Sequence, residues 1–444
     1  MRKFVRQSTV FACLAAGLGA AGMAQATNGY FSHGYGTTSK GLAGAGVALS
    51  QDSLAAATNP AGMVTLGDRI DFGVALFSPR REYSVGEFPG APDPAQDFAL
   101  EPGSYKSGSE YFLIPHFGWN RMLDDRSSIG ISIYGNGGMN TDYPAHSNPI
   151  RNAGGECPSG TFCAGKTGVD LMQLFIAPTY ARKINDTASW GVTPIIAYQR
   201  FEAKGLRSFA DMSRDSGSLS NEGHDDSWGY GLRLGIQGEV SPGVRLGAAY
   251  QTKMYMGKFD DYSGLFAEKG GFDIPANMTV GLAWDVTPTS TLFFDIQHIW
   301  YSDVKSIGNK FDRQGLGMCA QGFDSSGCLG ESGGSGFGWR DMTIYKLGYQ
   351  WTTSPDWTWR LGYSYGRQPI PSSEVLFNIL APAVIEHHLT FGFTRNIGPS
   401  NEFNFAAMYA PESKVSGDNA MFEGQKIELK MHQFEVEASY AWKF

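Results

Sequence analysis

The chain shows, from residue 68 to its end, the alternation of apolar and polar positions that is typical of β-strands. In residues 357–365 one face is aromatic or aliphatic, and the other carries Thr, Arg, Gly and Ser. Because successive side chains of a strand point to opposite faces, this period of two predicts strands with one apolar and one polar face. Fourteen such segments follow one another: 70–83, 111–122, 127–139, 169–184, 188–204, 227–240, 244–259, 277–287, 291–304, 341–353, 357–368, 385–397, 402–410 and 427–444.

The connections between these segments alternate between short and long. Six consist of three residues rich in Pro, Gly, Asp, Asn and Ser, which favour tight turns. The other seven are long, as in 140–168 and 305–340. Bacterial outer-membrane barrels have an even number of strands, short periplasmic turns and long external loops. The pattern therefore predicts an all-β fold, a 14-stranded antiparallel transmembrane β-barrel formed by residues 67–444.

The composition supports a membrane barrel over a soluble β-sandwich. Aromatic residues make up 13% of the chain and charged residues only 18%, and there are 58 glycines. A soluble domain carries about 25% charged residues. The apolar strand faces also end in aromatic residues, such as Trp228 and the terminal Phe444, as expected for girdles at the two membrane interfaces.

The N-terminus indicates export. Arg2, Lys3 and Arg6 precede an apolar run that ends in Ala24-Gln25-Ala26, which is typical of a cleavable signal peptide over residues 1–26. The expected location is therefore the bacterial outer membrane. The formal net charge of −8 argues against nucleic acid as a partner.

Four cysteines follow the signal, as the pairs Cys157 with Cys163 and Cys319 with Cys328. Each pair lies in a Gly/Ser-rich stretch, and exported chains meet an oxidising compartment, so we expect two local disulfides. The alternative is a four-cysteine metal site, which would require two loops far apart in sequence to meet. We predict no metal and no cofactor.

Residues 27–66 precede the first strand and are neither apolar enough for a membrane helix nor alternating. Gly and Ala fill this segment, which contains Asn59-Pro60-Ala61 near its end. Such small residues suit close packing inside a barrel. An exported chain with this segment and fourteen strands resembles the FadL-type family of outer-membrane transporters for long-chain fatty acids and other hydrophobic compounds. The sequence Gly135-Asn136-Gly137-Gly138-Met139-Asn140 in the third predicted strand is a second similarity.

The resemblance implies a hatch formed by residues 27–66 inside the barrel. It also implies a third strand that kinks and opens the wall, so that substrate leaves sideways into the membrane. By the same resemblance, substrate is expected to bind first in an apolar groove among external loops and then in a pocket that the N-terminus reaches, where Tyr30 and Phe31 are expected. The resemblance further implies passive transport and no enzymatic activity, and we expect a monomer surrounded by outer-membrane lipid and lipopolysaccharide. An exposed, frayed terminus is the alternative for Tyr30 and Phe31.

Two short motifs have a physical role in this scheme. Gly135, Gly137 and Gly138 interrupt an alternating strand, and glycine there marks a bulge or a close backbone approach, which suits a lateral gate. The alternative is that they begin a surface loop. In Asn59-Pro60-Ala61, Pro60 fixes its φ and holds Asn59 extended, and the Asn side chain can bond two strand backbones as a latch.

Candidate substrate-binding residues are of two kinds. Phe209, Leu265 and Phe266 lie in long connections, where apolar residues are costly unless they bind something, although loop-on-loop packing is an alternative. A fatty-acid carboxylate needs a cation, and alternation places Arg233, Lys346 and Arg360 on the lumen face, together with Lys253. The alternative is an ion-pair network in the lumen with Glu386, Glu435 and Glu437.

Three other functions remain open from the sequence. The same family includes channels for aromatic hydrocarbons, which need no cation in their pocket. A general diffusion porin would have an open polar channel and no hatch. A hydrolase would need a Ser–His pair, and His387 and His388 lie on a strand with no serine marked as their partner.

Overall fold

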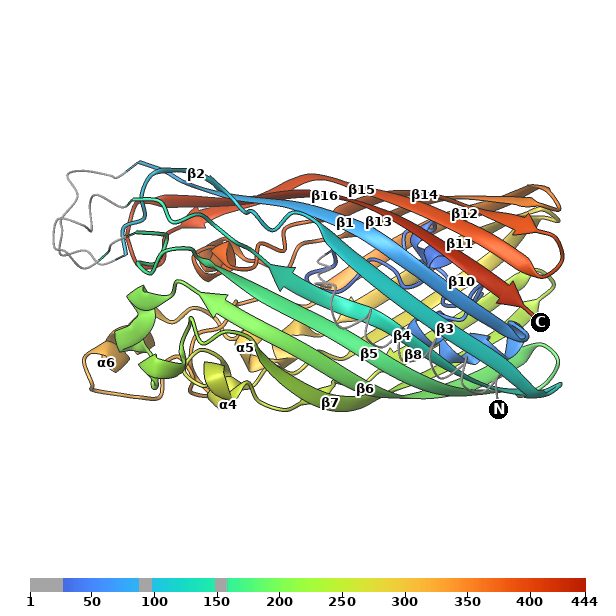
Figure 1. The fold of residues 1–444 in the computed structure, drawn as a ribbon, viewed down its shortest axis with the longest axis horizontal. Helices are drawn as coiled ribbons and strands as arrows, with labels where there is room; N and C mark the ends of the chain where they lie inside the picture. Colours follow the sequence, from blue (N-terminus) through green and yellow to red (C-terminus); the bar gives the residue numbers. More distant parts are fainter. Residues whose placement is uncertain (1–26, 88–97, 148–156, 158) are drawn as a thin grey trace, which may run out of the picture.

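The computed structural model describes residues 27–87, 98–147, 157 and 159–444, and the expected signal peptide at residues 1–26 lies outside them. Fourteen long strands form one antiparallel sheet that closes on itself (Figure 1). Closure comes from β16 (Lys426–Lys443), which pairs with β1 (Arg69–Val85) from Ile427 opposite Val85 to Lys443 opposite Arg69. The predicted 14-stranded barrel is confirmed.

The wall strands follow one another around the barrel in chain order. Between β1 and β16 they are β3 (Phe112–Asp124), β4 (Ser127–Asn140), β5 (Gly168–Lys183), β6 (Ala188–Lys204), β7 (Asp225–Ser241), β8 (Val244–Gln251), β10 (Asn277–Thr287), β11 (Ser290–Ile299), β12 (Met342–Ser354), β13 (Trp357–Gly366), β14 (His387–Ile397) and β15 (Asn401–Asp418). Two short strands extend the sheet: β2 (Gly103–Lys106) pairs with β1, and β9 (Tyr255–Met256) pairs with β7.

The two ends of the barrel differ as the alternating connections predicted. Short turns join the strands at the right-hand end of Figure 1, and long connections fill the left-hand end. The long connections contain η3 (Arg207–Met212), η4 (Ser216–Ser218), η5 (Asp260–Tyr262), α4 (Ala267–Gly270), η6 (Tyr301–Asp303), α5 (Lys305–Gly308), α6 (Arg313–Ala320), η7 (Ser372–Glu374) and η8 (Phe377–Ile379). Among the described residues, no helix has the length and apolar character needed to cross a bilayer.

Side chains alternate between the two faces of the wall. On β7, Trp228 and Tyr230 are 56% and 69% exposed on the outer face, whereas Arg233 on the inner face is 3% exposed. Exposed aromatic and aliphatic residues of this kind would be unfavourable in water, but they suit contact with lipid. The barrel therefore has the inverted polarity that the strand patterns predicted.

Three predicted strands end elsewhere. The segment 291–304 stops at Ile299, where β11 ends, and η6 follows it. The segment 244–259 splits, because β8 ends at Gln251 and β9 resumes four residues later as a partner of β7 alone. The segment 402–410 continues to Asp418, although Pro411 reads as a strand end. A bulge between Ala410 and Ser413 accommodates the proline, which cannot donate to the ladder, and pairing with β16 then resumes.

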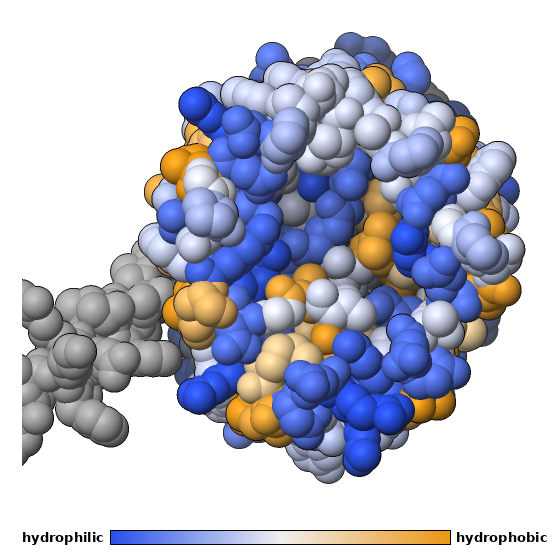
Figure 2. All heavy atoms as spheres, turned by 90° about the vertical axis from the view of Figure 1, so that its right-hand side faces the viewer, coloured by the Kyte–Doolittle hydropathy of each residue, from blue (hydrophilic) through white to orange (hydrophobic). Residues whose placement is uncertain are grey.

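The N-terminal segment, residues 27–66, lies inside the barrel and appears in blue in Figure 1. It contains α2 (Thr37–Lys40), η1 (Ala55–Ala57) and η2 (Pro60–Thr65). α2 packs against β14, β15 and β16, and η2 packs against β5, β6 and β7, so the segment touches opposite parts of the wall. Figure 2 looks at the end with the short turns, where a hollow lined mainly by hydrophilic residues leads inward.

Candidate functional site

Glycines on the inner face of the wall allow the N-terminal segment to approach the strands directly. A Cβ added at Gly235 of β7 would lie 2.0 Å from Oδ1 of Asn59, and one at Gly191 of β6 would lie 2.4 Å from the carbonyl carbon of Pro60. Only a residue without a side chain fits such contacts. A Cβ would likewise meet the segment at 3.0 Å or less at Gly118, Gly130, Gly247, Gly348, Gly362 and Gly392.

Asn59 fixes the end of the segment to the wall. Its Nδ2 donates to the carbonyl of Ile236 on β7 (3.0 Å) and to that of Val47 within the segment (2.6 Å). Its Oδ1 accepts from the N–H of Ala61 (3.1 Å), so Asn59 also caps η2, with Pro60 as the first helical residue. The side chain thus bonds one strand backbone, not the two expected from the sequence.

A buried ion pair holds the other side of the segment. Nζ of Lys40, at the end of α2, lies 2.6 Å from a carboxylate oxygen of Glu435 and 2.6 Å from one of Glu437, both on β16. The hydroxyl of Thr37 donates to Glu437 as well (2.7 Å). All three charged side chains are at most 5% exposed. Glu435 and Glu437 therefore bind the segment instead of the wall cations considered from the sequence.

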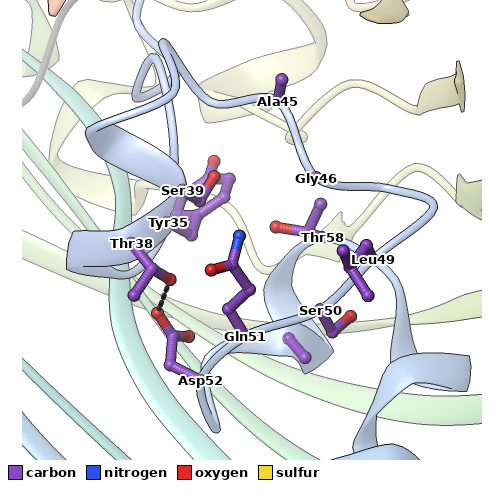
Figure 3. A pocket seen from close by; sticks show the side chains of 11 residues that line it. Tyr35, Thr38, Ser39, Ala45, Gly46, Leu49, Ser50, Gln51, Asp52 and Thr58 are labelled. Carbon is purple, nitrogen blue, oxygen red and sulfur yellow. Dashed lines mark hydrogen bonds between the residues drawn. The ribbon is translucent and has the colours of Figure 1, made fainter. Parts of the chain in front are cut away.

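The segment is also folded on itself, as Figure 3 shows. The hydroxyl of Thr38 donates to the carboxylate of Asp52, which also accepts from the N–H of Leu54 (3.0 Å). The cavity that these side chains enclose has a volume of about 20 Å³, room for about one water molecule. The segment thus occupies its part of the lumen as a compact body.

β4 pairs with β3 over its first half only. The ladder runs from Asp124 opposite Ser127 to Phe117 opposite Ile133. Beyond that point β3 continues along β1 and β4 continues along β5. Within the described chain, residues 134–140 of β4 pair with no residue of β3, and we call this stretch the wall opening.

β4 also changes direction at the wall opening. Its residues alternate between buried and partly buried up to Ile133, and residues 134–140 are all buried, so this part of the strand turns away from the outer surface. The register against β5 shifts between Gly135 and Gly137, which leaves Asn136 as a bulged residue. The glycines thus mark a bulge within the strand, as the sequence predicted, and do not begin a loop.

The N-terminal segment takes the place of β3 along the wall opening. The N–H of Gly138 donates to the carbonyl of Tyr30 (3.0 Å), and the N–H of Ser32 donates to the carbonyl of Asn136 (3.2 Å). Phe31 and Gly137 form a bridge between these bonds. A Cβ at Gly137 would lie 1.8 Å from the carbonyl oxygen of Tyr30, so glycine is required for this approach. The segment therefore lines the inner side of the opening.

Tyr30 and Phe31 belong to an aromatic cluster that we define as Tyr30, Phe31, Phe272, Tyr301 and Trp339. The ring centroid of Tyr30 lies 5.3 Å from those of Phe31 and Tyr301, 6.0 Å from that of Trp339 and 6.2 Å from that of Phe272. The hydroxyl of Tyr301 donates to the carbonyl of Asn28. Tyr30 and Phe31 are 0% and 1% exposed, so the terminus is not frayed in this structure.

Apolar residues from four connections meet beside this cluster, where Phe266 packs against Phe272. Phe209, Leu265 and Phe266 line a cavity of about 30 Å³, which we call the loop cavity, together with Val169, Phe201, Leu206, Ser306, Leu329, Ser335, Gly336, Phe337, Phe377 and Leu380. Phe209 and Phe266 are buried. The loops therefore pack on one another around a space that is smaller than the 150 Å³ or so that accommodates benzene in a protein core. A substrate would have to separate them.

The comparison of the sequence with protein families identifies the chain. The family described as outer membrane protein transport protein (OMPP1/FadL/TodX) matches residues 17–441. The chain belongs to this family. The protein is thus a transport protein of the bacterial outer membrane and not an enzyme. A comparison with curated proteins finds no match.

Solved structures of the FadL/TodX family share the fold. The toluene transporter TodX of Pseudomonas putida is 17% identical, with a TM-score of 0.66 over 93% of this chain and 99% of that chain. A FadL homologue of Pseudomonas aeruginosa is 15% identical, with a TM-score of 0.66 over 94% and 100%. The toluene transporter TbuX of Ralstonia pickettii is 17% identical, with a TM-score of 0.61 over 93% and 99%.

In this family member the predicted lumen cations bind the N-terminal segment. Arg360 donates to Gln51 (2.8 Å), and Lys346 donates to the carbonyls of His33 (3.1 Å) and Gly44 (3.4 Å).

Arg233 behaves in the same way. It donates to the carbonyl of Ala56 (3.1 Å) and to the hydroxyl of Tyr134 (3.4 Å). Lys253 instead pairs with Asp273 (2.9 Å) in a partly exposed position. These hydrogen bonds assign the cations a role in holding the segment, while carboxylate binding by them stays a prediction.

Both predicted disulfides are present in the FadL/TodX family member. Cys157 is bonded to Cys163 and Cys319 to Cys328, with Cα separations of 4.5 and 5.2 Å. The second bond joins Cys319 in α6 to Cys328, and the next residue, Leu329, lines the loop cavity. Among the described residues, no group of three or more His, Cys, Asp or Glu side chains could hold a metal ion.

The structure supplies a serine partner for one strand histidine. Nδ1 of His388 lies 3.1 Å from the hydroxyl of Ser364, and both residues are buried. However, Nε2 of His388 has no partner among the described residues, and the imidazole stacks on His33 at a centroid distance of 5.8 Å. The pair thus lacks the carboxylate that orients a catalytic histidine.

Two functional features escaped the sequence analysis. No sequence pattern indicates a role for Lys40, because it is one charge in a short segment without periodicity. The sequence predicts an external loop for the connection between β13 and β14, yet Val375, Leu376 and Ile379 are at most 1% exposed. Its hydrophobicity (Val-Leu-Phe-Asn-Ile-Leu) is the signal that could have placed it in the barrel interior.

Proposed function

We propose that this transport protein takes up hydrophobic molecules, with long-chain fatty acids as substrates, and releases them sideways through its wall. The observation that carries the proposal is the separation of β3 and β4 at Ile133, with Tyr30 of the N-terminal segment bonded along the freed edge. An opening in the wall is useful to a substrate that prefers lipid to water, and a hydrophilic solute would gain nothing from it.

The proposed route has three stages. The loop cavity around Phe209, Leu265 and Phe266 captures the molecule as the loops part. The aromatic cluster at Tyr30 and Phe31 receives it next, because this cluster is continuous with the loop cavity in one apolar core. Gly135, Gly137 and Gly138 then form the lateral gate. Burial of apolar surface drives each step, and we propose passive transport without a cofactor.

Residues 27–66 act as the hatch in this scheme, with Asn59, Pro60 and Ala61 as its latch. The segment crosses the lumen from β16 to β7, and the hollow at the end with the short turns is lined mainly by hydrophilic residues (Figure 2). A hydrophobic molecule would gain little from entering that hollow. The hatch therefore directs it toward the wall opening.

Aromatic hydrocarbons are the second candidate substrates. TodX and TbuX are described as toluene transporters, and aromatic residues dominate the cluster around Tyr30. Growth on oleate against toluene as sole carbon source, with and without the gene, tests the choice. Gene-dependent growth on oleate alone supports fatty acids, and gene-dependent growth on toluene alone rejects them.

A planar bilayer experiment tests the hatch against the general diffusion porin. The intact protein is expected to conduct small ions poorly, and a variant without residues 27–66 is expected to conduct them well. High conductance of the intact protein would show that the lumen is open and the hatch proposal wrong. Lipopolysaccharide and phospholipid as neighbours, and the monomeric state, stay predictions.

A further inference from the structure

The lumen face of β1 carries a buried arginine that has no counter-charge within the described residues. Arg81 is 4% exposed, and its Nη1 and Nη2 atoms have no hydrogen-bond partner among the described residues. It also forms no ion pair in the described part of the chain, whereas the neighbouring Arg80, which faces outward, pairs with Glu110. An unpaired charge buried in a protein is strongly unfavourable, so such a residue calls for a partner.

Two further side chains near Arg81, those of Tyr143 and Gln433, carry polar atoms without a partner among the described residues. The N–H of Ser107 donates to the carbonyl of Arg81 (3.0 Å), and Ser107 accepts from the N–H of Asp142 (3.0 Å), which brings the next residue, Tyr143, to the arginine. The ring of Tyr143 packs against that of Tyr83, which lies two residues from Arg81 on the lumen face of β1, and the hydroxyl of Tyr143 is buried without a partner among the described residues.

Gln433 is the second of these two side chains. It lies opposite Pro79 in the β1–β16 ladder, while Met431 lies opposite Arg81, so Gln433 is a diagonal neighbour of the arginine on the lumen face. Both Nε2 and Oε1 of Gln433 are buried with no partner in the described chain. Three side chains at this place thus leave hydrogen-bonding atoms unused.

Apolar residues surround these groups. Tyr83 packs against Tyr143 with ring centroids 4.7 Å apart, and Leu429 and Met431 are at most 1% exposed. All four belong to the same continuous apolar core as Tyr30. A polar group on one side and a long apolar path on the other match an amphiphile with a single anionic end.

We propose that Arg81, with Tyr143 and Gln433, binds the carboxylate of a fatty acid during transport, which rests on the uptake function proposed above. The guanidinium offers parallel N–H donors that suit the two oxygens of a carboxylate. The hydroxyl of Tyr143 and the amide of Gln433 supply further donors. The alkyl chain then lies along Leu429 and Met431 toward the aromatic cluster.

The test compares oleate with oleyl alcohol, which has the same chain and a neutral head. Equilibrium dialysis of the full-length purified protein in a non-ionic detergent measures both affinities. Arg81→Gln is expected to weaken oleate binding by at least about tenfold, the range for hydrogen bonds to charged groups, and to leave oleyl alcohol binding within about twofold. Arg80→Gln, the matched outward-facing control, is expected to change neither. Arg81→Lys keeps the charge and should retain part of the oleate affinity.

Several results would overturn the proposal. Unchanged oleate binding by Arg81→Gln, or an equal loss of oleate and oleyl alcohol binding, would give Arg81 a structural role only. If Arg81→Gln does not fold, as judged by heat-modifiable migration on gels, the affinities of the native protein for oleate and oleyl alcohol still test the proposal. Equal affinities for the two ligands contradict it. If the native protein binds neither ligand, the fatty-acid function itself fails; if it binds both equally, only the role of Arg81 fails.

Discussion

The carbonyl oxygen of Tyr30 accepts a hydrogen bond from the N–H of Gly138 at 3.0 Å, which joins the segment inside the lumen to the strand that opens the wall. The same carbonyl is the atom that excludes a side chain at Gly137. A displacement of the segment must therefore change the wall opening, and a displacement of the strand must change the aromatic cluster. In this geometry the proposed hatch and the proposed lateral gate are parts of one structure.

The first prediction concerns Gly137→Ala. The added methyl group would lie 1.8 Å from the carbonyl oxygen of Tyr30, so the bridge between Phe31 and residue 137 must break. We expect uptake of the hydrophobic substrate to fall at least about tenfold while the barrel still forms, because the other strand pairs of β4 and β5 remain. Uptake by cells and heat-modifiable migration of the purified protein measure the two effects.

Gly317→Ala is the matched control, since a Cβ at Gly317 meets nothing within 4 Å. Gly317 lies in α6, within the connection between β11 and β12, and its substitution should leave uptake unchanged. Equal uptake by the Gly137→Ala and native proteins would show that the contact between the terminus and β4 is unimportant for transport.

The second prediction concerns Gly235→Ala on β7. A Cβ there would lie 2.0 Å from Oδ1 of Asn59, so the side chain of Asn59 must move and give up its bond to Ile236. We expect higher ion conductance in planar bilayers than for the native protein, approaching that of the variant without residues 27–66. A conductance trace indistinguishable from native would show that Asn59 does not latch the segment.

These glycines also show which features of the fold can be predicted from the sequence and which cannot. The period-two pattern and the turn residues were sufficient for the barrel, because lipid on one side and water or polar atoms on the other impose a strict alternation. The small residues of the segment indicated close packing, but their counterparts, such as Gly191 and Gly235, read only as gaps in the polar strand faces. The close approach of the N-terminal segment to these wall glycines is seen only in the folded structure, where both lie side by side.

The candidate site was only partly predictable for a similar reason. Tyr30 and Phe31 could be named from the resemblance, whereas their neighbours Tyr301 and Trp339 come from another connection and leave no local motif. Charges on the lumen face could be listed from alternation, but which of them are paired depends on the segment. Arg360 is engaged by Gln51, and Arg81 is left without a partner among the described residues.

The third prediction concerns the ion pair of α2. Lys40→Met would leave Glu435 and Glu437 buried side by side without their cation. Removal of one partner from a buried ion pair costs about 3–5 kcal/mol, so the free energy of unfolding should fall by that amount. Urea-dependent unfolding in detergent micelles, followed by tryptophan fluorescence, measures it.

Lys414→Met provides the comparison for Lys40. Lys414 pairs with Glu428 at 3.3 Å, but the lysine side chain is 63% exposed, and exposed pairs contribute at most about 1 kcal/mol. The two variants should therefore differ clearly in urea midpoint. A midpoint for Lys40→Met as close to native as that of Lys414→Met would mean that the segment is not held by this pair.

The fourth prediction concerns Asn378, which anchors the buried connection between β13 and β14. Its Oδ1 accepts from Nε1 of Trp339 (2.6 Å), and its Nδ2 donates to the carbonyls of Phe337 (2.7 Å) and Glu374 (2.8 Å). Asn378→Ala would leave these groups unsatisfied in an apolar setting, at about 1–3 kcal/mol for each. We expect residues 371–385 to open locally and to exchange amide hydrogens faster.

Hydrogen-exchange mass spectrometry of peptides covering 371–385 checks this expectation, with Asn396→Ala as control because Asn396 bonds Pro355 at an exposed turn. Because the hydroxyl of Thr141, directly after β4, donates to the carbonyl of Leu380 (2.7 Å), the opening should spread to the end of that strand. Faster exchange in 371–385 without any change near Thr141 would show that the loop cavity and the wall opening move independently. Joint acceleration would instead support one concerted passage from the loops to the gate.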